Sequence, residues 1–270
     1  MQNAECRMQN AECRMQNAEC RMQNEEWGES MVYAVITAAS VMAGVIQSVT
    51  GFGSAVFLML IVPYFFDMVA ASAISSSIAM GLGVTLAWKF RAHLQWRTVL
   101  LPAVIYLIGS VGAIQVMGDI DLDVLSLAFG VFLILLAAYF LVFAKRLKFT
   151  ANRKSACVCS AISGVTSGLF GIGGPLMAVY FVSASDGKES YIANLQFLFA
   201  VTNIVNFFTR IYKGFYTFDL VPITLLGFAG ITLGKKLGLK VLDKLELESM
   251  KKGVYLFVGI SGVLNVIQQL

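Results

Sequence analysis

Two glycine-rich segments hold the residues whose types and spacing could bind a ligand. Residues 44–53 read G-V-I-Q-S-V-T-G-F-G, and residues 164–173 read G-V-T-S-G-L-F-G-I-G, 120 positions later. Glycine lets a backbone approach a ligand closely, and the first turn of a helix offers free N–H groups at the positive end of its dipole. We expect a half-helix to begin just after Gly53 and another just after Gly173, so that their amides could bind an anion.

Hydroxyl and amide side chains around these segments would complete such a site. We expect no Lys, Arg, Asp or Glu deep in the surrounding apolar runs, so the anion would be held without a buried cation. Gln196 and Asn203 are seven positions apart and therefore share one face of a helix. Close helix packing is the competing interpretation for any single Gly, Ser or Thr here. The candidate substrate-binding residues are Gln47, Ser48, Thr50, Gly51, Phe52, Gly53, Ser54, Ser76, Thr166, Ser167, Gly171, Ile172, Gly173, Gly174, Gln196 and Asn203.

Residue types suited to catalysis or metal binding are scarce. His93 is the only histidine and lies in a basic loop with Trp96, where orientation signals and aromatic belts belong. A nucleophilic serine needs a base within reach, so an intramembrane enzyme is a minor alternative. Cys157 and Cys159 have no metal-ligand partners elsewhere, and the phosphate-binding pattern G-x-x-x-x-G-K-[ST] is absent. We therefore predict no enzyme, no catalytic residue, no metal and no cofactor.

The composition indicates which elements position these residues. Of the 270 residues, 58% are hydrophobic and 13% are charged, whereas soluble domains have roughly 45–50% and about 25%. This excess predicts an all-α integral membrane protein in contact with the lipid bilayer, and it argues against a soluble enzyme or a nucleic-acid binder. The apolar runs are 32–49, 55–66, 68–90, 99–117, 124–143, 155–170, 176–182, 191–212, 220–237 and 253–268.

The chain divides into a tail and two similar halves. Residues 1–30 contain the heptapeptide MQNAECR three times, which predicts a low-complexity, disordered tail. Residues 31–144 and 155–270 are expected to form two transmembrane repeats, joined by a basic cytoplasmic linker at 145–154. Each repeat would contain one broken-helix hairpin and three transmembrane helices. Weak identity between halves at a constant offset is typical of duplicated transporters.

Basic residues predict how the chain is oriented. If each glycine-rich segment is the tip of a hairpin, the loops that share one face hold 15 of the 20 Lys and Arg residues. These loops are 89–97, 145–154, 183–190 and 235–252. The opposite face then has only Arg210 and Lys213, apart from the tail. The positive-inside rule places the first face in the cytoplasm. Both termini would lie outside the cytoplasm, and the two halves would be inverted relative to each other.

The hairpin-tip pattern T-G-F-G-S at residues 50–54, with its counterpart G-L-F-G-I-G-G-P at residues 168–175, resembles the TauE/SafE family of sulfite exporters and sulfonate-related anion transporters. The resemblance covers residues 31–270. It implies a bacterial-type inner-membrane permease that moves sulfite, a sulfonate or another small sulfur-containing anion. From the inverted halves we expect alternating access. An anion channel and a non-transporting scaffold or assembly protein are the alternatives. The sequence leaves open the direction, the coupling ion and whether chains associate as a homo-oligomer.

Overall fold

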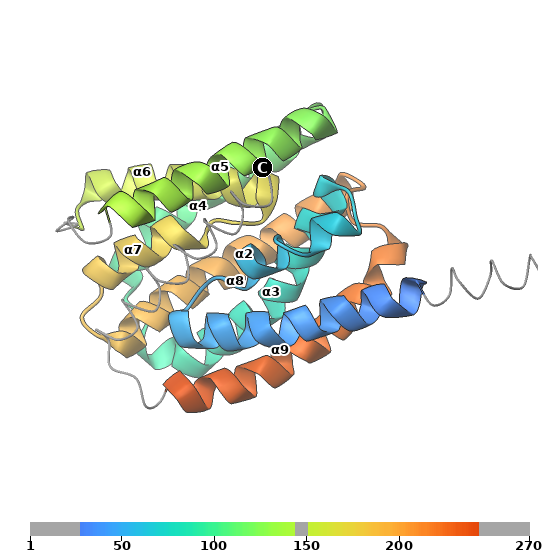
Figure 1. The fold of residues 1–270 in the computed structure, drawn as a ribbon. Coiled ribbons are helices and arrows are strands. Elements are labelled where there is room, and N and C mark those ends of the chain that lie inside the picture. Colours follow the sequence, from blue (N-terminus) through green and yellow to red (C-terminus); the bar gives the residue numbers. More distant parts are fainter. Residues whose placement is uncertain (1–27, 144–150, 243–270) are drawn as a thin grey trace, which may run out of the picture.

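The computed structural model describes residues 28–143 and 151–242, and every regular element in this part of the chain is helical. The all-α prediction is therefore confirmed for these residues. Most of the predicted tail, residues 145–150 of the linker and the apolar run 253–268 lie outside the described residues. The elements (Figure 1) are the first helix Gly28–Thr50, α2 Ser54–Leu58, η1 Val62–Tyr64, α3 Met68–Phe90, η2 Arg91–His93, α4 Trp96–Met117, α5 Leu122–Phe143, α6 Arg153–Phe170, α7 Gly174–Ala184, α8 Lys188–Tyr212, η3 Phe218–Leu220 and α9 Val221–Leu242.

Five of the described helices are long and apolar enough to cross a membrane. These candidate spans, which include adjoining 3-10 turns, are Gly28–Thr50, Met68–His93, Trp96–Met117, Lys188–Tyr212 and Phe218–Leu242. Side-chain caps explain where two of the helices begin. At the start of α3, the carboxylate of Asp67 accepts hydrogen bonds from the N–H groups of Val69 and Ala70, both at 2.9 Å. At the start of α6, Asn152 and Ser155 form a reciprocal capping box.

Both glycine-rich segments interrupt helices, as predicted. Residues 51–53 separate the first helix from α2, and residues 171–173 separate α6 from α7. Gly51, Gly53 and Gly171 have φ angles of 83°, 102° and 71°, in the left-handed region that residues with a Cβ atom rarely adopt. The chain reverses direction at each break (Figure 1). The first helix with α2, and α6 with α7, therefore form two hairpins.

The two hairpins have unequal second arms. The apolar run 55–66 forms less helix than its length suggests, because α2 has only five residues before the chain continues through a turn into η1. Pro63 explains this difference, since it has no N–H to bond to the carbonyl of Met59 and its ring clashes with that carbonyl in an α-helix. In the second hairpin, α7 continues for 11 residues.

Two pairs of helices pack closely through glycines. The first helix lies beside α9 (Figure 1), where Gly44 faces the carbonyl of Ile231 and lies against Gly234. In the same way, Gly164 of α6 faces the carbonyl of Tyr106 in α4. A Cβ atom on Gly44 or Gly164 would overlap with the carbonyl oxygen opposite, so these backbones can approach only because the residue is glycine. The first glycine of each glycine-rich segment therefore serves helix packing.

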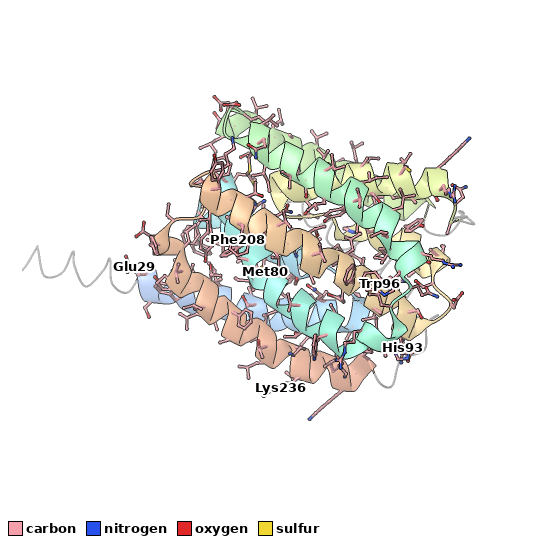
Figure 2. All side chains as sticks on the ribbon, turned by 180° about the vertical axis from the view of Figure 1, so that it is seen from behind. Glu29, Met80, His93, Trp96, Phe208 and Lys236 are labelled. Atoms are coloured by element: carbon pink, nitrogen blue, oxygen red, sulfur yellow. The ribbon has the colours of Figure 1, made fainter. Side chains whose placement is uncertain are left out.

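The connections between helices gather at two ends of the bundle. His93, Trp96 and Lys236 lie at one end, and Glu29 and Phe208 lie at the other (Figure 2). The described basic residues Lys89, Arg91, Lys188 and Lys235 lie in or beside the connections at the first of these ends, and we refer to it as the basic end.

Hydrogen bonds join the connections at the basic end. The N–H of Gln95 donates to Oδ1 of Asn194 at 2.9 Å, and Nδ2 of Asn194 donates to Oε1 of Gln95 at 3.0 Å. Nζ of Lys188 donates to the carbonyl of Leu242 at 3.2 Å. The loop 89–97, the start of α8 and the end of α9 therefore meet at this end, as the hairpin arrangement predicts.

Candidate functional site

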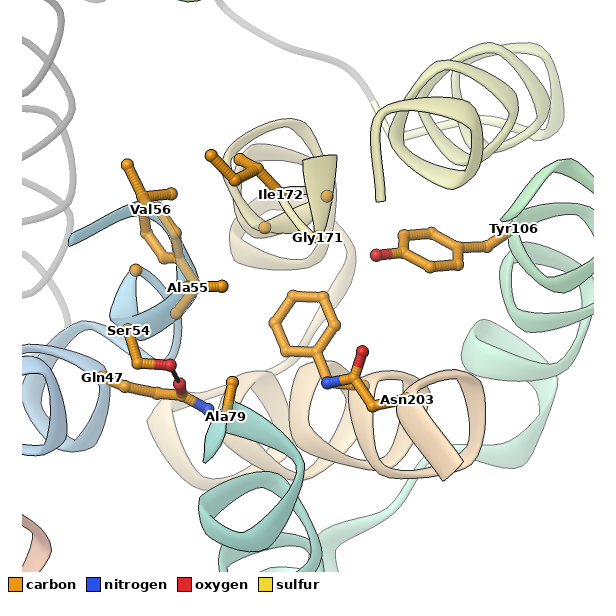
Figure 3. Close-up of a pocket in the computed structure, with 14 residues that line it drawn as sticks. Gln47, Ser54, Ala55, Val56, Ala79, Tyr106, Gly171, Ile172 and Asn203 are labelled. Carbon is orange, nitrogen blue, oxygen red and sulfur yellow. Dashed lines mark hydrogen bonds between the residues drawn. The ribbon is translucent and has the colours of Figure 1, made fainter. Parts of the chain in front are cut away.

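A cavity lies where the two breaks meet (Figure 3). Water-sized spheres can be centred in about 30 Å³ of it, which is room for roughly two water molecules. Segments about 120 residues apart in the chain therefore border one space. Most of the sequence candidates line it, namely Gln47, Phe52, Gly53, Ser54, Gly171, Ile172, Gly173, Gly174 and Asn203.

The tip of each hairpin inserts into the opposite half of the protein. Phe52, from the first tip, is buried among apolar residues of α4, α7 and α8. Phe170 and Ile172, from the second tip, are buried among residues of the first helix, α2 and α3. A Cβ atom on Gly174 would lie 2.9 Å from the ring of Phe52, so this close approach requires glycine. Reciprocal burial holds the two breaks together around the cavity.

Two polar side chains from other helices reach the same space. Tyr106 of α4 is 1% exposed, and its hydroxyl points toward the second break near Gly171 (Figure 3). A Cβ atom on Gly173 would overlap with this phenol oxygen, which also bonds to the side chain of Ser167. Asn203 of α8 lines the cavity, and no residue in the described ranges forms a hydrogen bond with its amide. This amide is therefore able to donate to a ligand.

The helix α7 begins at the cavity with an uncapped first turn. Its N-cap residue is Gly173, and no side chain bonds to the amides of this turn. Pro175 has no amide hydrogen, so the free donors are the N–H groups of Gly174 and Leu176 at the positive end of the helix dipole.

Half-helices begin after Gly53 and after Gly173, as expected from the sequence, but they differ in length. The dipole of a helix is the sum of its aligned peptide units, and α2 has five residues whereas α7 has 11. We therefore assign most of the positive potential at the cavity to α7. Ser54 at the start of α2 contributes a hydroxyl, which donates to Oε1 of Gln47 (Figure 3).

Side chains of α8 hold the first break in place. Gln196 is fully buried, and its amide donates to the carbonyl of Gly51. Its Oε1 accepts from Nε2 of Gln47 at 3.2 Å. Tyr191, one turn earlier on α8, donates to the carbonyl of Thr50 at 2.7 Å. Gln196 thus lies behind the cavity and fixes the backbone that borders it.

Arg210 of α8 holds the second break. Its guanidinium donates from Nη2 to the carbonyl of Gly168 at 2.9 Å and from Nη1 to Oγ of Ser76 at 3.1 Å. The side chain is 1% exposed, which corrects the expectation that no charged residue lies deep in a span. The sequence places Arg210 at the end of an apolar run, but the C-terminus of α6 packs over it. The carbonyls at this terminus are the negative end of the α6 dipole and accept hydrogen bonds from the cation.

The remaining sequence candidates lie beside the cavity rather than in its lining. Ser48 packs against Gly238 of α9. The hydroxyls of Thr50 and Thr166 bond to carbonyls of their own segments, which leaves them engaged in local structure. The full set outside the lining is Ser48, Thr50, Gly51, Ser76, Thr166, Ser167 and Gln196.

Sequence reasoning missed several residues of the lining. Among these, Tyr106 had a recognisable signal. Tyrosine usually lies at a membrane interface, so a tyrosine in the middle of an apolar run needs a polar partner for its hydroxyl. The apolar lining residues had no such signal, because apolar side chains occur on every face of a membrane helix. The missed residues are Ala55, Val56, Ala79, Tyr106 and Phe199.

Comparison with known proteins identifies the family. No curated protein and no solved structure matches this chain. In residues 28–143 and 151–242, no group of three His, Cys, Asp or Glu side chains is placed to hold a metal ion. A family model described as sulfite exporter TauE/SafE matches residues 36–264, which include both breaks, the whole cavity lining and Arg210. The resemblance of the hairpin tips is thereby confirmed. With its series of apolar helices, this chain is a multi-pass membrane protein that belongs to the TauE/SafE sulfite exporter family.

Proposed function

We propose that this protein is a secondary transporter for a small anion, which is sulfite, a sulfonate or a related sulfur-containing anion. The observation that carries the proposal is that the tips of two broken-helix hairpins line one cavity. Transporters commonly place half-helix N-termini around a substrate near the middle of the membrane. Membership of a sulfite exporter family favours a sulfur-containing anion as the substrate.

The chemistry of the cavity favours an anion over a cation. Among the described residues, the lining contains no carboxylate and no lysine or arginine. It offers the hydroxyl of Tyr106, the side-chain amide of Asn203 and the backbone amide of Gly174 in the first turn of α7, all of which donate hydrogen bonds. Phe52 and Phe199 contribute apolar wall to the cavity, and apolar surroundings strengthen the interaction of an anion with these donors.

The arrangement of the hairpins supports alternating access between two inverted halves. The hairpins enter the bundle from opposite ends (Figure 1). A glycine of each half also packs its helix against a helix of the other half, Gly44 of the first helix against α9 and Gly164 of α6 against α4. Because each tip is buried in the other half, a movement of one hairpin would open the cavity toward one end only. We propose that each end is opened in turn in this way.

The basic end would face the cytoplasm of a cell whose inner membrane holds the protein. Loops rich in Lys and Arg remain on the cytoplasmic side when helices insert. The first helix begins at the opposite end, near Glu29 (Figure 2). The N-terminus would therefore lie outside the cytoplasm, and the even number of predicted segments would place the C-terminus there as well.

The proposal is tested by transport into vesicles that contain the purified protein. We expect saturable uptake of [³⁵S]sulfite above that of empty vesicles. Tyr106→Phe removes the cavity hydroxyl without changing the ring, and we expect the half-saturation concentration to rise about 10- to 100-fold, because a hydrogen bond to a charged group contributes about 1.5–3 kcal/mol. Tyr212→Phe is the matched control, since Tyr212 is 86% exposed. Substitution of Gly173 is less informative, because a Cβ atom there already collides with Tyr106.

The alternatives have different outcomes in the same assay. A non-transporting scaffold gives no flux above that of empty vesicles. An anion channel gives flux that does not saturate with concentration. Equal half-saturation for Tyr106→Phe and Tyr212→Phe would remove the cavity from the transport path.

A further inference from the structure

Arg210 is a buried cation without a counter-ion in the described part of the chain. Its side chain is 1% exposed, and no Asp or Glu within residues 28–143 or 151–242 forms an ion pair with it. An unpaired charge is expensive to bury. A residue of this kind is retained where its charge serves an interaction that a neutral side chain cannot make.

The contacts of the guanidinium satisfy only part of its hydrogen-bonding capacity. Nη2 donates to the carbonyl of Gly168 at 2.9 Å and lies 3.5 Å from the carbonyl of Ser167, while Nη1 donates to Oγ of Ser76 at 3.1 Å. Nε is buried, and no residue in the described ranges accepts a hydrogen bond from it. These oxygens carry partial charges only, so the full positive charge of Arg210 is not neutralised.

The place of Arg210 in the fold connects it with the cavity. Arg210 follows Asn203 by seven residues on α8, so both lie on one face, about 10 Å apart along the helix axis. Asn206 lies between them, is 1% exposed and accepts a hydrogen bond from Ser110 at 2.9 Å. Since α8 begins at the basic end, this polar series leads from the cavity toward the opposite end. The carbonyls that hold Arg210 belong to the last turn of α6, directly before the break at Gly171.

We propose that Arg210 is a second binding position for the transported anion, between the cavity and the end opposite the basic end. This inference rests on the proposed transport function. The ligand is a small oxyanion with at least two oxygens on one central atom, because a guanidinium binds such a group through two parallel hydrogen bonds. Movement of the second hairpin withdraws the α6 carbonyls and releases the guanidinium to the anion.

Substitutions of Arg210 test the position directly. With [³⁵S]sulfite as the probe in vesicles, we expect Arg210→Gln to raise the half-saturation concentration at least about tenfold, as expected for a lost hydrogen bond to a charged group. Arg210→Lys keeps the charge but not the two-point geometry. We expect it to keep transport while losing discrimination between sulfite and chloride as a competitor. Arg97→Gln is the control, because Arg97 is exposed at the basic end.

Asn206→Asp tests the same position with Arg210 intact. This nearly isosteric change places a carboxylate one helical turn from Arg210, and Ser110 can still donate to it. If Arg210 binds the anion, the new carboxylate competes for the guanidinium and raises the half-saturation concentration at least about tenfold. If Arg210 only holds α6 in place, the new ion pair leaves transport unchanged. Gln115→Glu adds an exposed carboxylate near the same end and serves as the control.

The outcomes separate this inference from the proposed function. Absence of saturable sulfite uptake by the unaltered protein overturns both. Saturable uptake whose half-saturation is unchanged by Asn206→Asp, and whose anion discrimination is unchanged by Arg210→Lys, overturns only the Arg210 position. Size-exclusion profiles in detergent show which variants fold, and Asn206→Asp decides the matter if Arg210→Gln does not fold.

Discussion

The hydrogen bonds between Gln47 and Gln196 offer a quantitative test of how α8 holds the first break. Gln196→Leu removes the donor to the carbonyl of Gly51 and the acceptor for Nε2 of Gln47. Both groups are buried and would be left without a partner, at about 1–3 kcal/mol each. We therefore expect the free energy of unfolding to fall by about 2–6 kcal/mol. Gln47→Leu removes the acceptor of the Ser54 hydroxyl and leaves Oε1 of Gln196 without its hydrogen-bond donor.

The double variant separates the shared bond from the other contacts. When both glutamines are replaced by leucine, the bond between them is lost only once and neither amide remains unpaired. The combined loss should therefore be smaller than the sum of the two single losses by about 1–2 kcal/mol. Reversible unfolding in mixed detergent micelles measures each free energy. Gln115→Leu is the matched control, and its free energy of unfolding should change by less than about 0.5 kcal/mol because the side chain is exposed.

Two results would refute this reasoning. Single losses that add within about 0.5 kcal/mol would mean that Gln47 and Gln196 do not interact. Single losses no larger than that of Gln115→Leu would mean that the break does not depend on these bonds. In vesicles, we also expect Gln196→Leu to lower sulfite uptake more than Gln115→Leu does, since the backbone around Gly51 adjoins the cavity.

Two further predictions concern helix packing and orientation. Gly44→Ala should lower the free energy of unfolding by about 1–3 kcal/mol, because the new Cβ atom overpacks against Ile231. Gly112→Ala is the control: nothing lies within 4 Å of its new Cβ atom, so it should raise the free energy of unfolding by up to about 1 kcal/mol through helix propensity. Equal unfolding midpoints for the two variants would contradict the packing argument. In a cysteine-free background, Ile120→Cys should react with a membrane-impermeant thiol reagent added to intact cells and Ala92→Cys should not, and the reverse pattern would overturn the proposed orientation.

The positions of the breaks could be predicted from the sequence because they depend on local chemistry. Gly51, Gly53 and Gly171 adopt φ angles that other residues avoid. They interrupt apolar runs that are long enough to form helices. The lengths of those runs also predict the helices α3 and α8 closely. These features need only short-range information, so a single sequence is enough to find them.

The role of each polar side chain around the breaks was decided by tertiary structure. Gln196 and Asn203 share a face of α8, yet Gln196 binds the backbone of the first break while Asn203 lines the cavity. The sequence places Arg210 at a helix end, but packing of α6 over it makes it a buried cation. Tyr106 reaches the cavity only because Gly164 lets α4 and α6 approach closely. Glycines and apolar runs determine where a helix breaks, whereas the depth and partner of a side chain depend on which helices the whole fold brings against it.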